Sequence, residues 1–238
     1  MTDISIIVPA FNNAQWIGAA LQALAPMRAR GVEVIVVDGG STDGTAQLAA
    51  PLADRVLVAE NRRAAQMNAG ANIAQGYILL FLPVGIWLPP EADALLLHGP
   101  GREFALWGRF DIEIEGAHWL LPLVSRLINA HSRATGFATG AQALFMTREA
   151  FSRTGGFPDL SCMEDIVIAQ KLKTLSPPLC LRAKALTADE TFMRDGFWRT
   201  LWRMARLRLA WHLGTDPAEL ARRYPPRPHN SIVSRSET

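Results

Sequence analysis

The chain contains few cysteines, and its histidines are not paired at metal-binding spacing. Its 238 residues include two cysteines, Cys162 and Cys180, and five histidines, at positions 98, 118, 131, 212 and 229. Two isolated thiols fit a reduced, cytoplasmic protein better than a disulfide framework. Neither the thiols nor the imidazoles have a second ligand at zinc spacing, so we expect no zinc site.

Long hydrophobic runs and an excess of one charge are also absent. The longest apolar stretch, residues 77–90, is about fourteen residues long and is interrupted by Pro83 and Gly85, which makes it too short to cross a bilayer. The N-terminus MTDISIIVPAFNN has no basic segment ahead of a long apolar core, so we expect no secretory signal. The net charge of +2, from 24 basic and 22 acidic residues, gives no general attraction to nucleic acid.

The glycine motifs of two common nucleotide-binding folds are missing as well. A dinucleotide fold needs G-x-G-x-x-G directly after the first strand, where this sequence reads VPAFNN. No Walker phosphate loop is found, and the glycine-rich turn follows the second strand instead of the first. A nicotinamide oxidoreductase therefore lacks its fingerprint.

The sequence does contain a regular alternation of strand and helix patterns in its first hundred residues. Strands are predicted at residues 4–8, 33–37, 55–59 and 77–82, and helices at residues 15–25, 45–53 and 64–75. The strands are almost wholly apolar, which is typical of a parallel sheet covered on both faces. We therefore expect an α/β, Rossmann-like, mostly parallel sheet with helices on both faces.

The second half mixes element types. Strands are predicted at residues 103–115 and 143–147, and helices at residues 119–131, 148–153, 163–175 and 196–213. We expect one domain over residues 1–224, with a nucleotide-binding half (1–100), an acceptor half (101–195) and a C-terminal amphipathic helix (196–213), followed by a disordered tail (225–238) rich in Pro and Ser. Asp111, Glu113 and Glu115 alternate along the first of these strands, which predicts a solvated sheet face, with an acidic patch as the alternative.

Asp38 ends the second strand, in VIVVDGGSTDGT. Ligands of open α/β sheets bind beyond the carboxyl ends of the strands. A carboxylate there can accept hydrogen bonds from a nucleobase or a ribose hydroxyl, while Gly39 and Gly40 let the backbone approach the ligand closely. The alternative is a turn whose Asp and Ser only cap the next helix, and local chemistry leaves both interpretations open.

Six segments together carry a resemblance to a known family: SIIVPAFNN, VIVVDGGSTDGT, RRAAQMNAG, ATGAQALFMTREAF, GGFPDLSCMED and the basic, Trp-rich helix near the end. From Ile4 to Tyr224 the chain resembles the family-2 glycosyltransferases of GT-A fold. Within that family it is most similar to a small bacterial branch associated with rSAM proteins and arsenosugars. The resemblance implies inverting transfer of a hexosyl group from a nucleotide-diphosphate sugar to an acceptor hydroxyl.

The resemblance also implies which residues form the site. It makes Asp165 the general base, with Glu164 orienting it or raising its basicity, and it puts Gln142 and Arg194 on the acceptor side. The residues expected around the nucleotide sugar are Pro9, Phe11, Asp38, Gly39, Asp43, Arg63 and Asn68, with Arg63 facing the diphosphate. For Glu164 and Asp165 the alternative is that they only favour a helix N-terminus through its dipole.

Three departures from the branch bear on its metal. Pro83 to Ile86 stand where relatives carry H-A-D-T, Gly140–Ala141–Gln142 stands in place of G-D-Q, and residues 190–192 read E-T-F in place of R-R-W. Mg²⁺ or Mn²⁺ is expected from the family, but the ligand Asp is absent and an apolar loop offers only carbonyls. We therefore expect weakened or absent metal dependence, with arginines neutralising the leaving diphosphate. The alternative is a catalytically degenerate homologue acting as a binding or scaffold subunit at the membrane.

The helix predicted at 196–213 is both basic and aromatic. On a helix its apolar side chains share one face, namely Phe197, Trp198, Leu201, Trp202, Ala205 and Leu209, and Arg199, Arg203 and Arg206 share the other. This pattern favours binding to an anionic surface on the inner face of the membrane, which would fit a lipid-linked acceptor. The alternative is a helix packed on the sheet with its arginines reaching outward, which would fit a soluble acceptor.

Overall fold

A single mixed sheet of eight strands organises the molecule. The computed structural model describes residues 2–99, 101, 105–160, 163–188, 195–212, 215 and 219. Within this part, the strand order is β3-β2-β1-β4-β7-β6-β8-β5. The first four strands of that order run parallel to one another, and β6 runs parallel to β8. Strand β7 is antiparallel to both β4 and β6, and β5 is antiparallel to β8.

The first half alternates strand and helix as predicted. Its elements are β1 (Ile4–Ala10), α1 (Ala14–Ala29), β2 (Glu33–Asp38), α2 (Thr45–Ala49), β3 (Arg55–Val58), α3 (Arg63–Ile73) and β4 (Ile78–Phe81). Every residue of β1, β2 and β4 is buried, because helices cover both faces of this part of the sheet. Helix α2 is shorter than predicted, since the chain leaves it after Ala49 and continues in hydrogen-bonded turns.

Besides a short 3-10 helix, the rest of the chain contains three elements that the sequence did not reveal. Its elements are β5 (Ile86–Trp87), α4 (Ala92–His98), β6 (Trp107–Glu115), α5 (Leu121–Thr135), the short 3-10 helix η2 (Gly140–Gln142), β7 (Phe145–Thr147), α6 (Arg148–Thr154), α7 (Glu164–Lys173), β8 (Leu179–Ala188) and α9 (Phe197–His212). The unexpected elements are β5, α4 and β8. Strand β8 pairs with β6, and β5 pairs with β8, so this edge of the sheet has two more strands than predicted.

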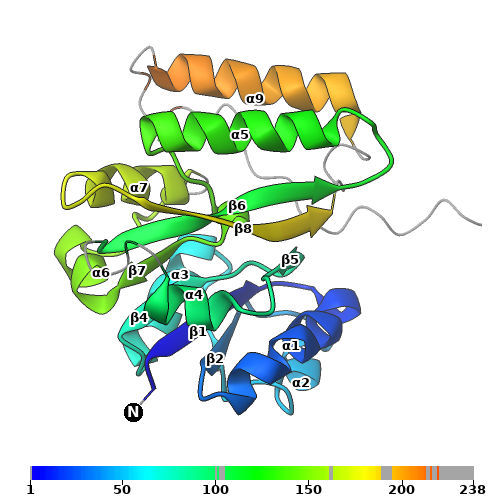
Figure 1. Ribbon diagram of the computed structural model, residues 1–238. Helices are drawn as coiled ribbons and strands as arrows, with labels where there is room; N and C mark the ends of the chain where they lie inside the picture. The colour runs from blue at the N-terminus through cyan, green and yellow to red at the C-terminus, as the bar shows by residue number, and fades with distance from the viewer. Residues whose placement is uncertain are drawn as a thin grey trace, which may run out of the picture.

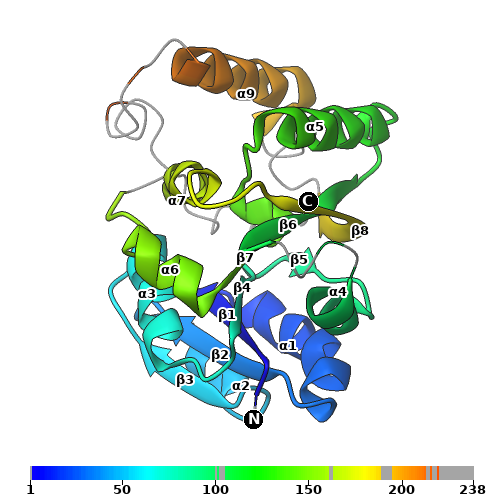
Figure 2. The ribbon, with the colours of Figure 1, turned by 60° about the vertical axis from the view of Figure 1, so that its left-hand side comes forward.

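Three apolar clusters hold the layers together. One joins α1, α2 and α4 to one face of the sheet, and a second joins α3, α6 and α7 to the other face. Figure 2 shows these two helix groups on opposite sides of the first four strands. The third cluster packs α5 onto β6, and Phe197 and Leu201 of α9 pack against it. Helices α5 and α9 therefore form an outer layer beyond β6 and β8, at the top of Figure 1.

Helix α5 is tied to β6 by side chains that bond to the strand backbone. Strand β6 pairs with β7 through Trp107 and Gly108. Farther along the strand, Asn129 of α5 accepts a hydrogen bond from the Ile112 N–H and donates one to the Ile112 carbonyl, both at 2.9 Å. These side-chain bonds replace a neighbouring strand at that edge.

The acidic side chains of β6 correct one prediction. Asp111 does not lie on a solvated face: it is buried and forms ion pairs with Arg109 and with Arg133 of α5. Arg109 is itself fully buried, and its guanidinium also donates to the Ser132 hydroxyl. Of the three carboxylates, only Glu115 at the end of the strand is fully exposed.

Candidate active site

The loops that follow β1 and β2 are held together by side chains. The Asn12 N–H donates to Ser41 Oγ at 2.8 Å, and the Asn13 N–H donates to Thr45 Oγ1 at 2.8 Å. In the opposite direction, the Thr42 N–H donates to Asn12 Oδ1 at 2.9 Å. These bonds fix one rim of the site at the carboxyl ends of two parallel strands, where open sheets bind ligands.

Asp38 is engaged within its own turn. Its carboxylate is 2% exposed and accepts hydrogen bonds from the Gly40 N–H at 3.1 Å, from the Ser41 N–H at 2.8 Å and from the Ser41 hydroxyl. These bonds close the turn after β2, and neither Asp38 nor Ser41 caps the next helix α2, whose N-cap residue is Gly44. The predicted contact between Asp38 and a nucleoside stays a prediction.

Asp43 joins the same rim to the start of α1. Its carboxylate accepts hydrogen bonds from the Thr45 hydroxyl at 2.5 Å, the Thr45 N–H at 3.1 Å and the Ala14 N–H at 2.9 Å. Burial alone would raise the pKa of Asp43, but these hydrogen bonds to the ionised form outweigh it and hold the pKa below its ordinary value. Asp43 is therefore charged and bound to the protein.

Gly39 is required by a close approach between elements. The Gln66 side chain of α3 donates to the carbonyls of Ala10 and Val37, at 2.7 and 3.1 Å, and so joins the ends of β1 and β2 to α3. A Cβ at Gly39 would lie 2.9 Å from Gln66 Nε2 and 3.1 Å from Asn61 Oδ1. A larger residue would push this clamp apart.

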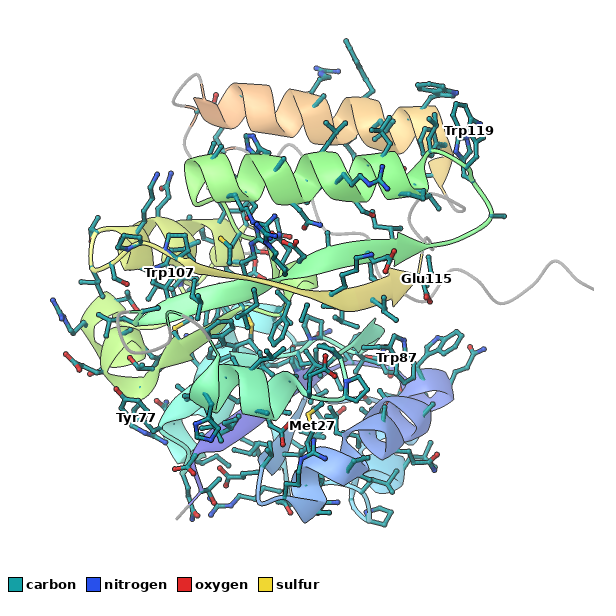
Figure 3. The ribbon with its side chains drawn as sticks, in the orientation of Figure 1. Met27, Tyr77, Trp87, Trp107, Glu115 and Trp119 are labelled. Atoms are coloured by element: carbon teal, nitrogen blue, oxygen red, sulfur yellow. The ribbon has the colours of Figure 1, made fainter. Side chains whose placement is uncertain are left out.

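A cavity of about 430 Å³ opens beside this rim. Five of the predicted site residues line it, namely Pro9, Phe11, Arg63, Glu164 and Asp165. A second cavity of about 370 Å³ shares Asn13, Arg63, Pro83 and Val84 with the first and extends toward Trp87 of β5 and the end of β8. Figure 3 shows Trp87 on the side of the molecule where β6 ends at Glu115. The two cavities form one cleft with Arg63 in both walls.

Arg63 and Glu164 face each other across the cleft. Arg63 is the first residue of α3, its side chain is 41% exposed, and its Nε lies 3.5 Å from Glu164 Oε1. The Glu164 side chain is only 5% exposed. Burial raises the pKa of Glu164, against the opposing attraction of Arg63 and with added repulsion from Asp165.

Asp165 is fixed by two backbone donors. Its Oδ2 accepts the Gly140 N–H at 2.5 Å, and its Oδ1 accepts the Ile166 N–H at 2.8 Å. Gly140 also lies against Arg63, because a Cβ at this position would be 1.8 Å from Arg63 Nη2. Gly140 therefore separates the arginine from Asp165, a role that sequence reasoning missed. The sequence signal for this residue was its position in the segment Gly140–Ala141–Gln142, where the resembling branch shows G-D-Q.

Two other predicted residues, Asn68 and Gln142, do not line the cleft. Asn68 accepts the Phe157 N–H and donates to the Phe157 carbonyl, both at 2.9 Å, so it joins α3 to the chain after α6. Gln142 is buried in η2, where its Oε1 accepts the Thr139 N–H at 3.2 Å and its Nε2 has no hydrogen-bond partner in the described part of the chain. Arg194 lies outside the described residues.

The part of the cleft where the family's metal ligand is expected does not fit a hard divalent cation with the residues described. The loop from Pro83 to Ile86, where the family's metal ligand is expected, presents no side-chain oxygen, and its neighbours Ala141 and Ala188 add none. Over the described ranges, no group of three or more His, Cys, Asp or Glu side chains is close enough together to hold a metal ion. Mg²⁺ and Mn²⁺ prefer carboxylate oxygens. Asp189 and Glu190 follow β8 but lie outside these ranges.

Comparison with known sequences finds a glycosyltransferase match in the first half of the chain. Residues 5–98 match the model of glycosyl transferase family 2. A PGL/p-HBAD biosynthesis glycosyltransferase of Mycobacterium bovis is 38% identical over 98 residues, which cover 38% of this chain and 38% of that relative. The match therefore spans well under half the length of these curated relatives.

Comparison with solved structures finds the same fold over most of the chain. Mannosyltransferase PcManGT from Pyrobaculum calidifontis, in complex with GDP-Man and Mn²⁺, superposes with a TM-score of 0.65 at 22% identity, over 94% of this chain and 65% of that one. S. aureus TarS 1-349, in complex with UDP-GlcNAc, superposes with a TM-score of 0.60 at 20% identity, over 79% of this chain and 59% of that one.

These comparisons confirm the predicted resemblance and fold, while the finer bacterial branch and the loss of its metal motif stay predictions. No helix in the described part is long and apolar enough to cross a membrane. The chain thus has the GT-A fold, and its residues 5–98 match the model of glycosyl transferase family 2.

Proposed function

We propose that this protein transfers a hexosyl group from a nucleotide-diphosphate sugar to an acceptor hydroxyl, with inversion at the anomeric carbon. One observation carries the proposal: the cleft brings a cation, Arg63, together with two carboxylates, Glu164 and Asp165. A departing diphosphate needs positive charge, and an attacking hydroxyl needs a base. The family match over residues 5–98 and the GT-A fold support the same reaction class.

The donor's diphosphate would bind at Arg63 and the N-terminus of α3. The N-cap residue Arg62 makes no side-chain cap hydrogen bond, so the first N–H groups of this 11-residue helix are not capped by a side chain. Asn61, Arg62 and Arg63 line the cavity at this end of the helix. Uncapped N–H groups and the helix dipole both favour an anion.

Asp165 would act as the general base, as the family resemblance implies. It takes the proton of the acceptor hydroxyl while the hydroxyl oxygen forms a bond to the anomeric carbon. The bond from that carbon to the diphosphate oxygen breaks, and the electron pair leaves with the nucleoside diphosphate beside Arg63. The two backbone N–H groups on Asp165 hold its carboxylate in one orientation. Glu164 is the second carboxylate, and its ion pair with Arg63 positions the guanidinium.

We propose that the metal contributes little to this reaction. The cleft wall at Pro83 to Ile86 offers no carboxylate for Mg²⁺ or Mn²⁺, which in glycosyltransferases supply positive charge to the diphosphate. Arg63 is the cation shared by both cavities and could take over this charge, and Arg194 is a second candidate from the sequence. An arginine binds phosphate oxygens through a fixed fork of donors.

Calorimetry with nucleoside diphosphates tests the donor site directly. We expect one of UDP and GDP to bind, and Arg63→Ala to weaken that binding by roughly 10- to 150-fold, because a lost charge-assisted hydrogen bond costs about 1.5–3 kcal/mol. Arg153→Ala is the matched control, since Arg153 is exposed on α6 and pairs only with Glu149. Equal affinity in wild type and Arg63→Ala would remove Arg63 from the donor site.

A catalytically degenerate scaffold is the second candidate function. It is favoured by the loss of three polar positions expected in one pocket, at Gly85, Ala141 and residues 190–192. A scaffold of this kind transfers no sugar, whether or not it still binds a nucleotide. Incubation with radiolabelled UDP- and GDP-sugars separates the two functions: a transferase hydrolyses its donor slowly even without acceptor, whereas a scaffold releases no sugar. We further propose a cytoplasmic protein with a lipid-linked acceptor at the inner membrane face.

A further inference from the structure

The outer layer formed by α5 and α9 exposes an unusual amount of apolar surface. In the described part of the chain, nine large apolar side chains are exposed, and five of them lie on this layer: Trp119, Leu123, Leu127, Trp198 and Trp202. Their exposed fractions run from 50% to 80%. Figure 3 shows Trp119 at one end of this layer, far from the sheet. Single exposed apolar residues are ordinary, but a contiguous group marks a binding surface.

These five side chains form two rows along neighbouring helices. Leu123 and Leu127 are spaced four residues apart on one side of α5, and Trp119 lies in the turn just before that helix. Trp198 and Trp202 are likewise four residues apart on α9. The rows border an apolar groove of about 420 Å³, which Leu123, Leu127 and Trp198 all line. We call these rows and their groove the α5–α9 face.

The α5–α9 face is the outward side of a packed helix pair. Val124 and Ile128 of α5 turn toward β6, and Phe197 and Leu201 of α9 pack on the same cluster. The four apolar residues of α9 predicted to share one face are therefore divided between two environments. Phe197 and Leu201 pack inward, whereas Trp198 and Trp202 are exposed.

Arginines flank the two rows on their outer sides. At about 100° per residue, Arg199 and Arg206 share a stripe of α9 beyond the tryptophans, on the side away from the groove. Arg126 occupies the corresponding outer flank of α5. All three are exposed, and none forms an ion pair within the described ranges. Neither helix sequence contains an acidic residue.

We propose that the α5–α9 face docks on the surface of an anionic lipid bilayer. The tryptophan and leucine rows would enter the boundary between headgroups and acyl chains, where amphipathic aromatic rings are favoured. Arg126, Arg199 and Arg206 would then reach lipid phosphates on both sides. The charge pattern favours a bilayer over other partners. The apolar centre of the face would match the acyl chains, and the flanking cations would match the anionic headgroups.

A second copy of the chain fits this surface less well. In a two-fold dimer the same patch meets itself, so the arginine stripes would approach like charges with no acidic partner on either helix. The proposal deepens the proposed function, because a lipid-linked acceptor would be met at that surface. It rests on the proposed function only for the identity of the acceptor.

Vesicle co-sedimentation of the full chain tests the docking without donor or acceptor. We expect binding to vesicles of phosphatidylcholine with phosphatidylglycerol and much weaker binding to phosphatidylcholine alone, with affinity falling as salt is raised. Trp198→Ser/Trp202→Ser should weaken binding by about tenfold or more. Arg199→Gln/Arg206→Gln should weaken it by roughly 30-fold, about fivefold for each arginine.

Two control pairs distinguish this face from general stickiness. Val58→Ser/Tyr77→Ser removes exposed apolar side chains from the nucleotide-binding half, and Arg153→Gln/Arg182→Gln removes exposed cations from α6 and β8. Both should bind vesicles as the wild type does. Thermal unfolding should be unchanged in the tryptophan pair, since both side chains are mostly exposed.

Three outcomes would overturn the proposal: no binding of the wild type to anionic vesicles, equal losses in test and control pairs, or a dimer by light scattering that the tryptophan pair alone converts to monomer. The last outcome would make the face a contact between copies. Donor binding by calorimetry is measured separately, so a failed transferase and a failed docking surface give different results.

Discussion

Arg63 lies where three parts of the cleft meet. Its guanidinium is 3.5 Å from the Glu164 carboxylate and so close to Gly140 that no Cβ fits between them without displacing it. Gly140 in turn donates its N–H to Asp165. Gly140 thus contacts both the cation proposed for the diphosphate and the base proposed for the acceptor.

We predict that Gly140→Ala impairs nucleotide binding more than stability. The new methyl group would meet Arg63 Nη2 at 1.8 Å and force this flexible side chain aside. Nucleoside diphosphate affinity should fall by roughly tenfold, near the lower limit for a lost charged hydrogen bond. The free energy of unfolding should change by less than about 1 kcal/mol, because the tip of a surface arginine can move.

Gly18→Ala is the control for Gly140→Ala. No atom lies within 4 Å of a Cβ built at Gly18, which is in the middle of α1. The control should gain up to about 1 kcal/mol of stability from helix propensity and keep its nucleotide affinity. Unaltered affinity in Gly140→Ala would mean that Arg63 does not bind the donor from its present position.

We predict that Glu164 makes the protein less stable as pH rises. Burial raises the pKa of Glu164 in the folded state, so between its unfolded pKa of about 4.3 and the higher folded pKa the native state binds more protons than the unfolded state. Stability contributed by this group is full below that window and falls across it. Glu164→Gln cannot titrate, so its stability relative to wild type should rise with pH.

Urea unfolding from about pH 4 to about pH 7 measures this difference. Glu149→Gln serves as the reference, since Glu149 is an exposed carboxylate on α6. A stability difference between wild type and Glu164→Gln that stays constant with pH would show that burial does not control this carboxyl group. The direction matters for function, because a carboxyl held partly against ionisation is typical of catalytic clefts.

We predict that Asp165→Asn lowers turnover by about 10² to 10⁴ with nucleotide affinity nearly unchanged. The amide keeps the shape but cannot take a proton. Because both carboxylate oxygens accept backbone N–H groups, the amide nitrogen would face a donor and one hydrogen bond would be lost. Single-turnover rates and calorimetry on the same variant separate chemistry from binding. Wild-type turnover in this variant would assign the proton transfer to another group.

Among the strands, those with a regular apolar pattern were predicted, whereas β5 and β8 were not. The all-apolar strands β1, β2 and β4 and the helices between them were found from periodicity, because both faces of each strand are buried. Strand β8 is partly exposed along most of its length and carries Arg182 and Lys184, and its partner β5 is two residues long. Neither has a strong local signal, since their order comes from pairing with β6 and with each other.

The ion pairs of Asp111 illustrate the same limit. An acidic residue alternating along a strand predicts a solvated face, and the partner that reverses this, Arg133, comes from a helix much later in the sequence. Long-range pairing of this kind leaves no trace in local periodicity.

We predict that Asn129→Ala destabilises the fold by about 2–4 kcal/mol, because it leaves the Ile112 N–H and carbonyl without their side-chain partner at a buried strand edge. The control is Asn72→Ala, since Asn72 is exposed on α3 and should change stability by less than about 0.5 kcal/mol. Denaturant unfolding measures both variants. Equal stability of Asn129→Ala and Asn72→Ala would mean that water satisfies this edge and that α5 is held by its apolar contacts alone.

At the scale of the whole molecule, the residues of one cleft wall could be predicted from the sequence, whereas those of the opposite wall could be predicted only in part. Pro9 lies near the end of β1, Phe11 follows this strand and Arg63 begins α3, where strand-end reasoning and the family match agree. The opposite wall comes from η2 and the start of α7, beyond the residues that the family model matches. There the resemblance named Asp165, but only the fold shows that Gly140 binds it.

The lack of a carboxylate at the Pro83–Ile86 side of the cleft leads to a final prediction. Since the described walls offer no carboxylate near Gly85, Mn²⁺ should tighten nucleoside diphosphate binding by less than about tenfold, a coupling below roughly 1.4 kcal/mol. An acid is best restored at Val84, which lines both cavities, because Gly85 has a φ of 91° that strains any other residue. Val84→Asp should create a metal-dependent gain in affinity, and Val84→Asn, its uncharged match, should not. Calorimetry with and without Mn²⁺ measures both.

A large Mn²⁺ effect on nucleotide affinity in the wild type would contradict the prediction. If the double variant Asp189→Asn/Glu190→Gln then lost that Mn²⁺ effect, the metal ligands would be the two acids that follow β8 in the sequence. The metal site would in that case be completed by a segment of the acceptor half.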